Sequence, residues 1–353
     1  MPGAIPCAAN SLAASTESMT ILAVNAGSSS LKFSLHPLAG GAVQPPALSG
    51  NIEGLQPGGV PLMRWRLACG DGSRALTTGT ADVFIEALSS LRELLAVEAV
   101  LPRVQAVAHR VVHGGERYTR SVIVDADVLT KLEILNSLAP LHQPHNIAGI
   151  RAFTEAFPSV PQVACFDTAF HATAPALHQS FALPASLTSQ GVRRYGFHGL
   201  SYQYIIGELL QHSQRGQGRV LMAHLGNGAS LCAALEGESI ASTMGFSALD
   251  GLMMGTRSGT LDPGVLLYLM EQGWDRRRIE QLLYKESGLL GVSGLSADMR
   301  TLRADSSAAA RRATDLFAHR VVRECGAMLA CLQGLDVMAF SGGIGEHDAI
   351  LRQ

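Results

Sequence analysis

The feature that most constrains this chain is a short pattern that occurs twice, once in each half of the sequence. In the first copy, ILAVNAGSSSLKFSL (residues 21–35), two apolar runs flank a turn of glycine and serine. In the second, VLMAHLGNGASLCAAL (residues 220–235), two apolar runs again flank a glycine-rich polar turn. Strand-like and helix-like segments alternate around both copies, which is typical of an α/β protein. We therefore predict two related domains that face each other across a cleft.

Hydrophobic periodicity places the other elements. The predicted domains cover residues 19–168 and 169–353, after a disordered N-terminal extension at 1–18. Between residues 37 and 72 glycine and proline are frequent, which predicts loops and short strands at the sheet edge. We predict strands at 20–24, 31–35, 104–112, 163–166, 220–223, 231–234 and 337–340, and helices at 81–97, 148–156, 263–271, 277–284 and 314–332.

Composition excludes several classes of protein. The 353 residues exceed what one core usually spans, which supports two domains. A net charge of −2 gives no sign of a nucleic-acid or membrane partner. No apolar run approaches the ~18 residues that a membrane span requires. The six cysteines form no C-x-x-C pair, so we expect free thiols in a reducing, cytoplasmic environment.

Three glycine-rich turns suggest a phosphate ligand. They are NAGSSS, HLGNGAS and SGGIGEH, and each follows a predicted strand. Such turns can direct backbone N–H groups and hydroxyls at a phosphate. One of them alone would equally fit an ordinary hairpin, and no G-x-x-x-x-G-K-[ST] motif is present, which excludes a P-loop. Together they predict a nucleotide whose phosphates lie between the two domains.

Two arginines and one aspartate are candidates for phosphoryl-transfer chemistry. Arg110 lies in AHRVVHGGERY and Arg257 in GLMMGTRSGTLDP, both near glycines that permit close approach of a ligand. Asp167 follows a short strand, where open α/β sheets place functional side chains. The alternatives are surface ion pairs for the arginines and a helix or turn cap for the aspartate.

Histidines raise the question of a metal site. His109 and His113 are four residues apart, and His142 lies three before a further histidine. There is no H-E-x-x-H motif, and strand residues four apart are not adjacent, so a zinc-dependent hydrolase is the weaker alternative. We interpret His142 and His198 as hydrogen-bond donors to a substrate or transition state.

These motifs together resemble the acetate and propionate kinase family of the sugar-kinase and actin superfamily. The resemblance extends from Thr20 to His347 and rests on NAGSSSLKF, HRVVHGG, APLHQPHN, FDTAFH, RRYGFHGLSY, HLGNGAS, GLMMGTRSG, DPG and SGGIGEH. It implies two duplicated actin-like (RNase H-like) domains facing a central nucleotide cleft. It also implies reversible phosphoryl transfer from ATP to acetate with Mg²⁺, for which Mn²⁺ can substitute, in a homodimer.

The resemblance assigns a role to each matching residue. Arg110 and Arg257 would hold acetate and the transferring phosphoryl group. His198, supported by His142, would hydrogen-bond the phosphoryl oxygens, and Asp167 would organise the magnesium or its waters. The remaining matches are Val112, Leu141 and Phe197 in the acyl pocket, Asn25 at the metal, and Lys32, His224, Gly226, Asn227, Gly228, Asp298, Met299, Arg300, Gly342, Gly343, Ile344 and Gly345 around the nucleotide.

The sequence departs from the family pattern at three places. Ala248 stands where a proline is usual in the acyl pocket, which predicts a broader acyl range that includes propionate. Thr260 replaces a common aspartate, with no predicted consequence. The chain also lacks the C-terminal Asn-Glu-Glu segment, whose glutamate is associated with magnesium. We therefore keep two alternatives: another short-chain acyl kinase, and a truncated, catalytically impaired nucleotide-binding protein.

Overall fold

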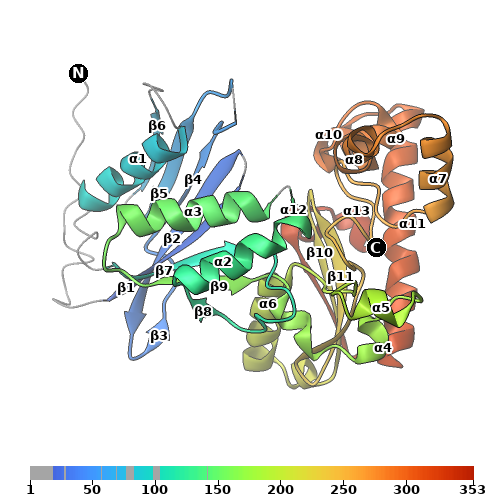
Figure 1. Cartoon of the computed structure of the whole chain (residues 1–353), viewed down its shortest axis with the longest axis horizontal. Helices are drawn as coiled ribbons and strands as arrows, with labels where there is room; N and C mark the ends of the chain where they lie inside the picture. The colour runs from blue at the N-terminus through green and yellow to red at the C-terminus, as the bar shows by residue number, and fades with distance from the viewer. Residues whose placement is uncertain are drawn as a thin grey trace. The chain divides into compact units, whose positions relative to one another are not determined.

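The computed structural model describes residues 19–27, 29–56, 58–68, 70–76, 83–97, 104–140 and 142–353 (Figure 1). The predicted extension over residues 1–18 and the acyl-pocket residue Leu141 lie outside the described residues. The chain divides into two compact units. The first unit comprises the chain up to Val112 together with Ser121–Cys165, and the second comprises His113–Arg120 together with Phe166–Gln353.

The first unit is built on a hairpin that continues into a parallel pair. β1 (Thr20–Ala26) and β2 (Ser30–Ala39) pair antiparallel, with Asn25 opposite Lys32. β7 (Val104–Val111) lies parallel to β1 on its other side. Alternate residues of β1 are buried, as expected for a strand with one face on the core. The strands predicted at 20–24, 31–35 and 104–112 are therefore confirmed.

The glycine-rich segment after β2 forms the edge of this sheet. β4 (Leu48–Glu53), β5 (Leu62–Leu67) and β6 (Gly70–Ala75) add successively in antiparallel pairs. One glycine here makes room for a ring within the sheet: a Cβ on Gly50 would lie 2.5 Å from Cζ of Phe33. The predicted short edge strands are thus present and continuous with the rest of the sheet.

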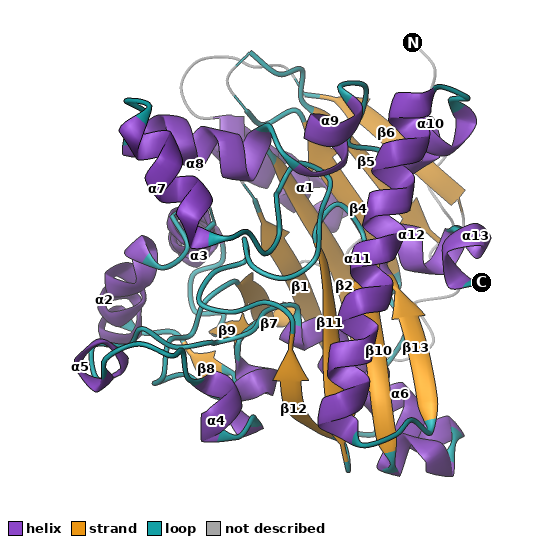
Figure 2. Cartoon of the chain, turned by 90° about the vertical axis from the view of Figure 1, so that its right-hand side faces the viewer, coloured by secondary structure: helices purple, strands orange, loops and turns teal. Residues whose placement is uncertain are grey.

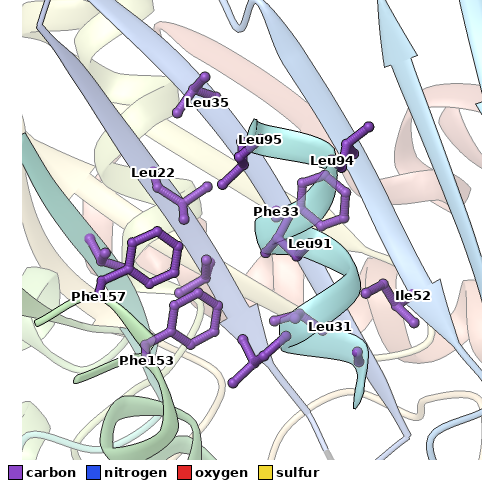
Figure 3. Packing of buried hydrophobic residues seen from close by; sticks show 14 of the residues in the cluster. Leu22, Leu31, Phe33, Leu35, Ile52, Leu91, Leu94, Leu95, Phe153 and Phe157 are labelled. Carbon is purple, nitrogen blue, oxygen red and sulfur yellow. The ribbon is translucent and has the colours of Figure 1, made fainter. Parts of the chain in front are cut away.

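Two helices cover the core of the first unit (Figure 3). α1 (Val83–Val97) supplies a stripe of buried leucines, and α3 (Gln143–Ala156) supplies Phe153. These side chains pack with Leu22 and Phe33 of the hairpin in one cluster. α3 begins before the predicted residue 148, because a proline is tolerated in the first turn of a helix and does not end the pattern there.

The second unit repeats the hairpin and parallel-strand arrangement. β10 (Arg219–Leu225) pairs antiparallel with β11 (Ala229–Leu235) and parallel with β13 (Val337–Ser341), while β12 (Glu238–Ser242) pairs with β11. The order β11–β10–β13 matches β2–β1–β7 in strand direction as well as in position. The predicted α/β fold with a duplicated motif is confirmed.

Helices cover the second sheet too. The long helix α11 (Ala308–Leu332) contacts β10, β11 and β12, and α6 (Gly199–His212) contacts β10. Figure 2 shows α11 running along β10 and β11. The predicted helices at 263–271, 277–284 and 314–332 correspond to α7 (Pro263–Glu271), α8 (Arg276–Lys285) and α11, so all three are confirmed.

One predicted turn is wrong. Of the segment SGGIGEH, the residues after the serine form helix α12 (Gly342–His347), which Ser341 precedes as the N-cap.

None of the described helices is both long and apolar enough to cross a membrane. The other described strands and α-helices are β3 (Ala42–Val43), β8 (Val122–Ile123), β9 (Gln162–Phe166), α2 (Ala126–Ile134), α4 (Ala176–Gln179), α5 (Ala185–Thr188), α9 (Gly288–Ser293), α10 (Met299–Ala304) and α13 (Ala349–Arg352).

Candidate active site

The second unit holds His198 in a defined orientation. His198 is the N-cap of α6 and adopts a left-handed backbone with φ of 59°. Its Nδ1 shares a hydrogen bond of 2.8 Å with Oγ of Ser230, which is fully buried and also hydrogen-bonds the Tyr202 hydroxyl. A backbone outlier supported by a buried hydrogen-bond network is typical of a functional site. Sequence reasoning missed Ser230, although it lies within HLGNGAS.

Arg257 and His198 meet at the second glycine turn. A Cβ on Gly228 would lie 2.9 Å from Nη2 of Arg257 and 3.3 Å from Nε2 of His198. The missing side chain therefore leaves room for an arginine and an imidazole at the same backbone turn. Nη1 of Arg257 donates to the carbonyl oxygen of Ala248 at 2.6 Å, which fixes the direction of the guanidinium group.

His224 extends this cluster along β10. Its ring centroid lies 4.3 Å from that of His198. Its Nδ1 is within hydrogen-bond distance of two hydroxyls, Ser201 Oγ at 3.0 Å and Ser341 Oγ at 3.3 Å. The end of β10 thus places a second imidazole beside the first, with hydroxyls from α6 and β13 around it.

Asp167 contacts the start of α6, next to His198. Only 2 % of Asp167 is exposed, and its carbonyl oxygen accepts the N–H of Gly199 at 2.8 Å. The start of α6 is therefore tied to the residue that follows β9. Phe197, predicted for the acyl pocket, is 2 % exposed and immediately precedes His198. Asp167, Phe197 and His198 therefore meet at the start of α6, and the turn at Gly228 lies against both His198 and Arg257.

A cavity of about 1000 Å³ opens beside this turn. Asp298 and Ile344 line it from α10 and α12, and Asn227 lines it from the turn. Arg303, which sequence reasoning missed, lines it too and forms an ion pair of 3.0 Å with Asp348. The predicted nucleotide residues on the cavity wall are Gly226, Asn227, Asp298, Met299, Arg300, Gly343 and Ile344, whereas His224, Gly228, Gly342 and Gly345 are not on it.

Asp298 and Arg300 bind each other at the start of α10. The carboxylate of Asp298 caps the helix by accepting the Arg300 N–H at 2.8 Å. It also accepts the guanidinium group of Arg300, with Nη2 at 2.6 Å from Oδ2. These bonds from Arg300 hold the pKa of Asp298 below its usual value. The pair places two opposite charges on a cavity wall that suits a polar ligand.

The first unit positions a separate set of predicted residues. Arg110 and Asn25 lie near the carboxyl ends of the parallel neighbours β7 and β1, with Arg110 Nη1 3.5 Å from Asn25 Oδ1. Val112 donates its N–H to the buried side chain of Asn146 at 3.0 Å. His142 is the N-cap of α3. Of the predicted pair of arginines, Arg110 therefore belongs to the first unit and Arg257 to the second.

The histidines of the zinc alternative have other partners. His109 Nε2 lies 2.7 Å from Oε1 of the buried Gln162, and burial lowers its pKa to about 4. His113 Nδ1 accepts the N–H of Gly115 at 2.9 Å, and burial likewise lowers its pKa to about 4. Within the described part of the chain, no three His, Cys, Asp or Glu residues gather as a metal site.

The duplicated α/β framework, with an arginine and a histidine at a glycine turn beside a large cavity, is typical of a phosphotransferase. Comparison with protein families specifies which one: residues 20–353 match the Acetokinase family. The chain belongs to this family.

Individual relatives agree with that assignment. An acetate kinase of Rhodopseudomonas palustris is 49% identical over 347 residues, which cover 94% of this chain and 84% of the relative. A propionate kinase structure from Francisella tularensis superposes with a TM-score of 0.87 at 37% identity, covering 95% of this chain and 86% of the other. An acetate kinase structure from Porphyromonas gingivalis gives 0.82 at 35% identity, with coverage of 95% and 85%.

Proposed function

We propose that this protein reversibly transfers the γ-phosphoryl group of ATP to acetate, forming acetyl phosphate and ADP. The convergence of Arg257 and His198 on Gly228, in a member of the Acetokinase family, carries this proposal. Propionate is the second candidate acceptor, because Ala248 replaces the usual proline and one similar structure is that of a propionate kinase. Nothing in the comparisons favours a catalytically impaired nucleotide-binding protein.

The chemistry requires neutralisation of charge more than proton transfer. A carboxylate is already ionised at neutral pH, so no general base has to activate it. The obstacle is repulsion between an anionic nucleophile and an anionic phosphate. Arg257 supplies a fixed positive charge, and His198 supplies an imidazole whose Nδ1 is held by Ser230. We assign Arg110 to the carboxylate and phosphoryl oxygens as well, with His142 supporting His198.

The cavity of the second unit is the proposed ATP site. Its size is at the upper end of small-molecule pockets, which suits a nucleotide. Asn227 would contact the phosphates, because its backbone turn adjoins Arg257 and the cavity wall. Asp298 and Arg300 would contact the adenosine part. Lys32, opposite Asn25 in the first hairpin, is assigned to the phosphates.

Magnesium fits the donors that the chain supplies. Mg²⁺ prefers oxygen ligands and usually takes only one or two from the protein, with phosphates and water completing the shell. Asp167 offers a buried carboxylate in the second unit, and Asn25 offers an amide oxygen in the first. When bound with ATP, the ion would offset phosphate charge. Mn²⁺, which takes similar ligands, is the expected substitute.

We further infer a homodimer in the cytoplasm. No residue of α7 is buried, although the helix is largely apolar, and Leu267 and Tyr268 are 63 % and 59 % exposed. Apolar surface of this kind is typical of an association site. The described cysteines are free thiols, as expected in a reducing compartment.

Arg257→Ala tests the proposed function. Loss of the guanidinium group should lower the kcat for acetyl phosphate formation by about 10³-fold or more, because one arginine at such a transition state is worth roughly that much. Circular dichroism should show an unchanged fold. Arg277→Ala, at an exposed position of α8, is the matched control and should retain full activity. Near-normal turnover by a folded Arg257→Ala variant would refute the assignment.

A further inference from the structure

A half-buried ion pair joins Arg194 to the loop that carries Arg257. Arg194 Nη1 is 3.1 Å from Oδ2 of Asp250, and the two side chains are 21% and 28% exposed. The other end of the same guanidinium group donates to the carbonyl oxygens of Ser242 and Thr243, at 3.3 and 3.1 Å. Arg194 thus connects the end of β12 to the loop that follows it.

Thr260 completes the same connection on the other side of Asp250. Its hydroxyl donates to Asp250 Oδ1 at 2.8 Å and accepts the N–H of Gly251 at 3.1 Å. Its own N–H donates to the carbonyl oxygen of Gly251 at 2.9 Å. One threonine therefore closes the loop of residues 250–260, which contains Arg257, and occupies both oxygens of Asp250 together with Arg194.

The segment that contains Arg194 also leads directly to His198. The N–H groups of Tyr195 and Gly196 donate to the carbonyl oxygen of Gly245, at 3.0 and 3.3 Å. His198 follows two residues later. Both the backbone and the side chain of this segment are thereby bound to the loop that presents Arg257.

We propose that Arg194, Asp250 and Thr260 form a positioning cluster that holds Arg257 and His198 in register for phosphoryl transfer. The cluster does not line the nucleotide cavity, so it acts through the two residues that it orients. The inference rests on the proposed function. It also gives Thr260 a role: the hydroxyl of this exposed residue bridges Oδ1 of Asp250 and the N–H of Gly251 at the two ends of the loop.

Paired substitutions at Thr260 test the cluster. Thr260→Val removes the hydroxyl and keeps the shape, whereas Thr260→Ser keeps the hydroxyl. We expect the valine variant to lower kcat by about 10²-fold, the loss that a displacement of ~1 Å in a catalytic group produces, with the KM for ATP unchanged. The serine variant should retain wild-type kcat. Equal kcat values for the two variants would overturn the proposal.

Asp250→Asn is a second test of the positioning cluster, and the same unit offers a matched control. Arg219 pairs with Asp336 at 2.8 Å, and these side chains are 40% and 32% exposed, respectively. Asp250→Asn should reduce kcat, and Arg194→Gln should reduce it at least as much, because it also removes the hydrogen bonds to Ser242 and Thr243. Asp336→Asn should leave kcat unchanged. A loss in Asp336→Asn as large as in Asp250→Asn would show a general effect of charge removal and overturn the proposal.

Hydrogen exchange separates this inference from the proposed function. Amides of residues 245–260 should exchange faster in Thr260→Val than in the wild type or Thr260→Ser, with or without substrate. Unchanged exchange would refute the positioning cluster. If the wild-type protein produced no acetyl phosphate, the proposed function would fail, and exchange over residues 245–260 would still decide whether the cluster holds the loop.

Discussion

Gly228 is a position where a single methyl group would meet both Arg257 and His198. Its backbone φ is not in the left-handed region, so alanine is tolerated by the main chain. The added Cβ, however, would meet Nη2 of Arg257 at 2.9 Å and Nε2 of His198 at 3.3 Å. Either side chain must move to accommodate it.

We therefore predict that Gly228→Ala lowers kcat by about 10²-fold through misplacement of these groups. The melting temperature should change little, because the clash falls on side-chain ends. Gly326→Ala is the matched control: this exposed glycine of α11 has nothing within 4 Å of an added Cβ. It should stabilise the protein by about 0.5–1 kcal/mol and leave kcat unchanged. Normal turnover in Gly228→Ala would contradict the proposed geometry.

Ala248 is the second residue with a specific expectation. We predict that the wild-type protein uses propionate nearly as well as acetate, and that Ala248→Pro favours acetate, because the ring reduces the acyl pocket. One methylene in an apolar pocket changes discrimination by about 10–200-fold. The ratio of kcat/KM for the two acids measures this, with Ala248→Gly as the control that should keep the broad range. Strong rejection of propionate by the wild type would contradict the prediction.

Among the elements, α7 is an apolar helix whose side chains the second unit leaves uncovered. It begins with Asp262 as N-cap, whose carboxylate accepts the Gly264 N–H at 2.8 Å, followed by a proline. Its apolar side chains then remain exposed. An isolated apolar helix surface costs solubility unless a partner covers it.

Leu267→Glu should consequently shift the protein from dimer to monomer in sedimentation velocity. The introduced charge would have to be buried in the interface. Val322→Glu provides the comparison, since Val322 is a 70 % exposed apolar residue on another helix, α11. Its sedimentation should match the wild type. A dimer that persists in Leu267→Glu would exclude α7 from the interface.

At the scale of the whole molecule, buried histidines make stability depend on pH. His171 is fully enclosed, with hydrogen bonds to Ser239 Oγ at 2.8 Å and to the Phe197 carbonyl oxygen at 2.9 Å. Burial lowers its pKa to about 4. His109 in the first unit has the same lowered value. Their ordinary pKa in an unfolded chain is about 6.5.

Between pH 6.5 and 4 the unfolded chain thus binds protons that the folded chain does not, so the free energy of unfolding falls as pH decreases. Each such histidine contributes on the order of 3 kcal/mol across this window. Urea midpoints at pH 7, 5.5 and 4.5 should fall steadily. His109→Gln should flatten the slope, whereas His212→Gln, whose side chain is 74% exposed, should not. An equal slope in all three proteins would contradict this account.

Several elements could be predicted from local patterns, for identifiable reasons. α7 was predicted with its observed bounds, because Asp262-Pro263 and a glycine two residues past its end are strong start and stop signals. The strands of both hairpins followed from apolar runs around glycine turns. α12 was missed because its glycines favour a turn locally, and packing of Gly345 against β10 and β13 overrides that preference.

The residues of the candidate site also fall into two groups, those that local motifs predict and those that they do not. Motifs located Arg257, His198 and Asn227, because each lies in a short stretch of glycine and polar residues. They could not locate Ser230, Arg194 or Arg303, whose roles depend on partners at least 28 residues away in the sequence. Such partners are set by the packing of helices on the sheet rather than by any local pattern.

By itself, the sequence determined the family, the duplicated α/β framework and the residue types that handle phosphate, since these depend on periodicity and on motifs of adjacent residues. Only the tertiary structure decided that His198 and Arg257 both lie against the turn at Gly228 and that Asp250 and Thr260 bind each other at the two ends of the loop that contains Arg257. Hydrogen bonds and close contacts between distant segments form only when the core has aligned them.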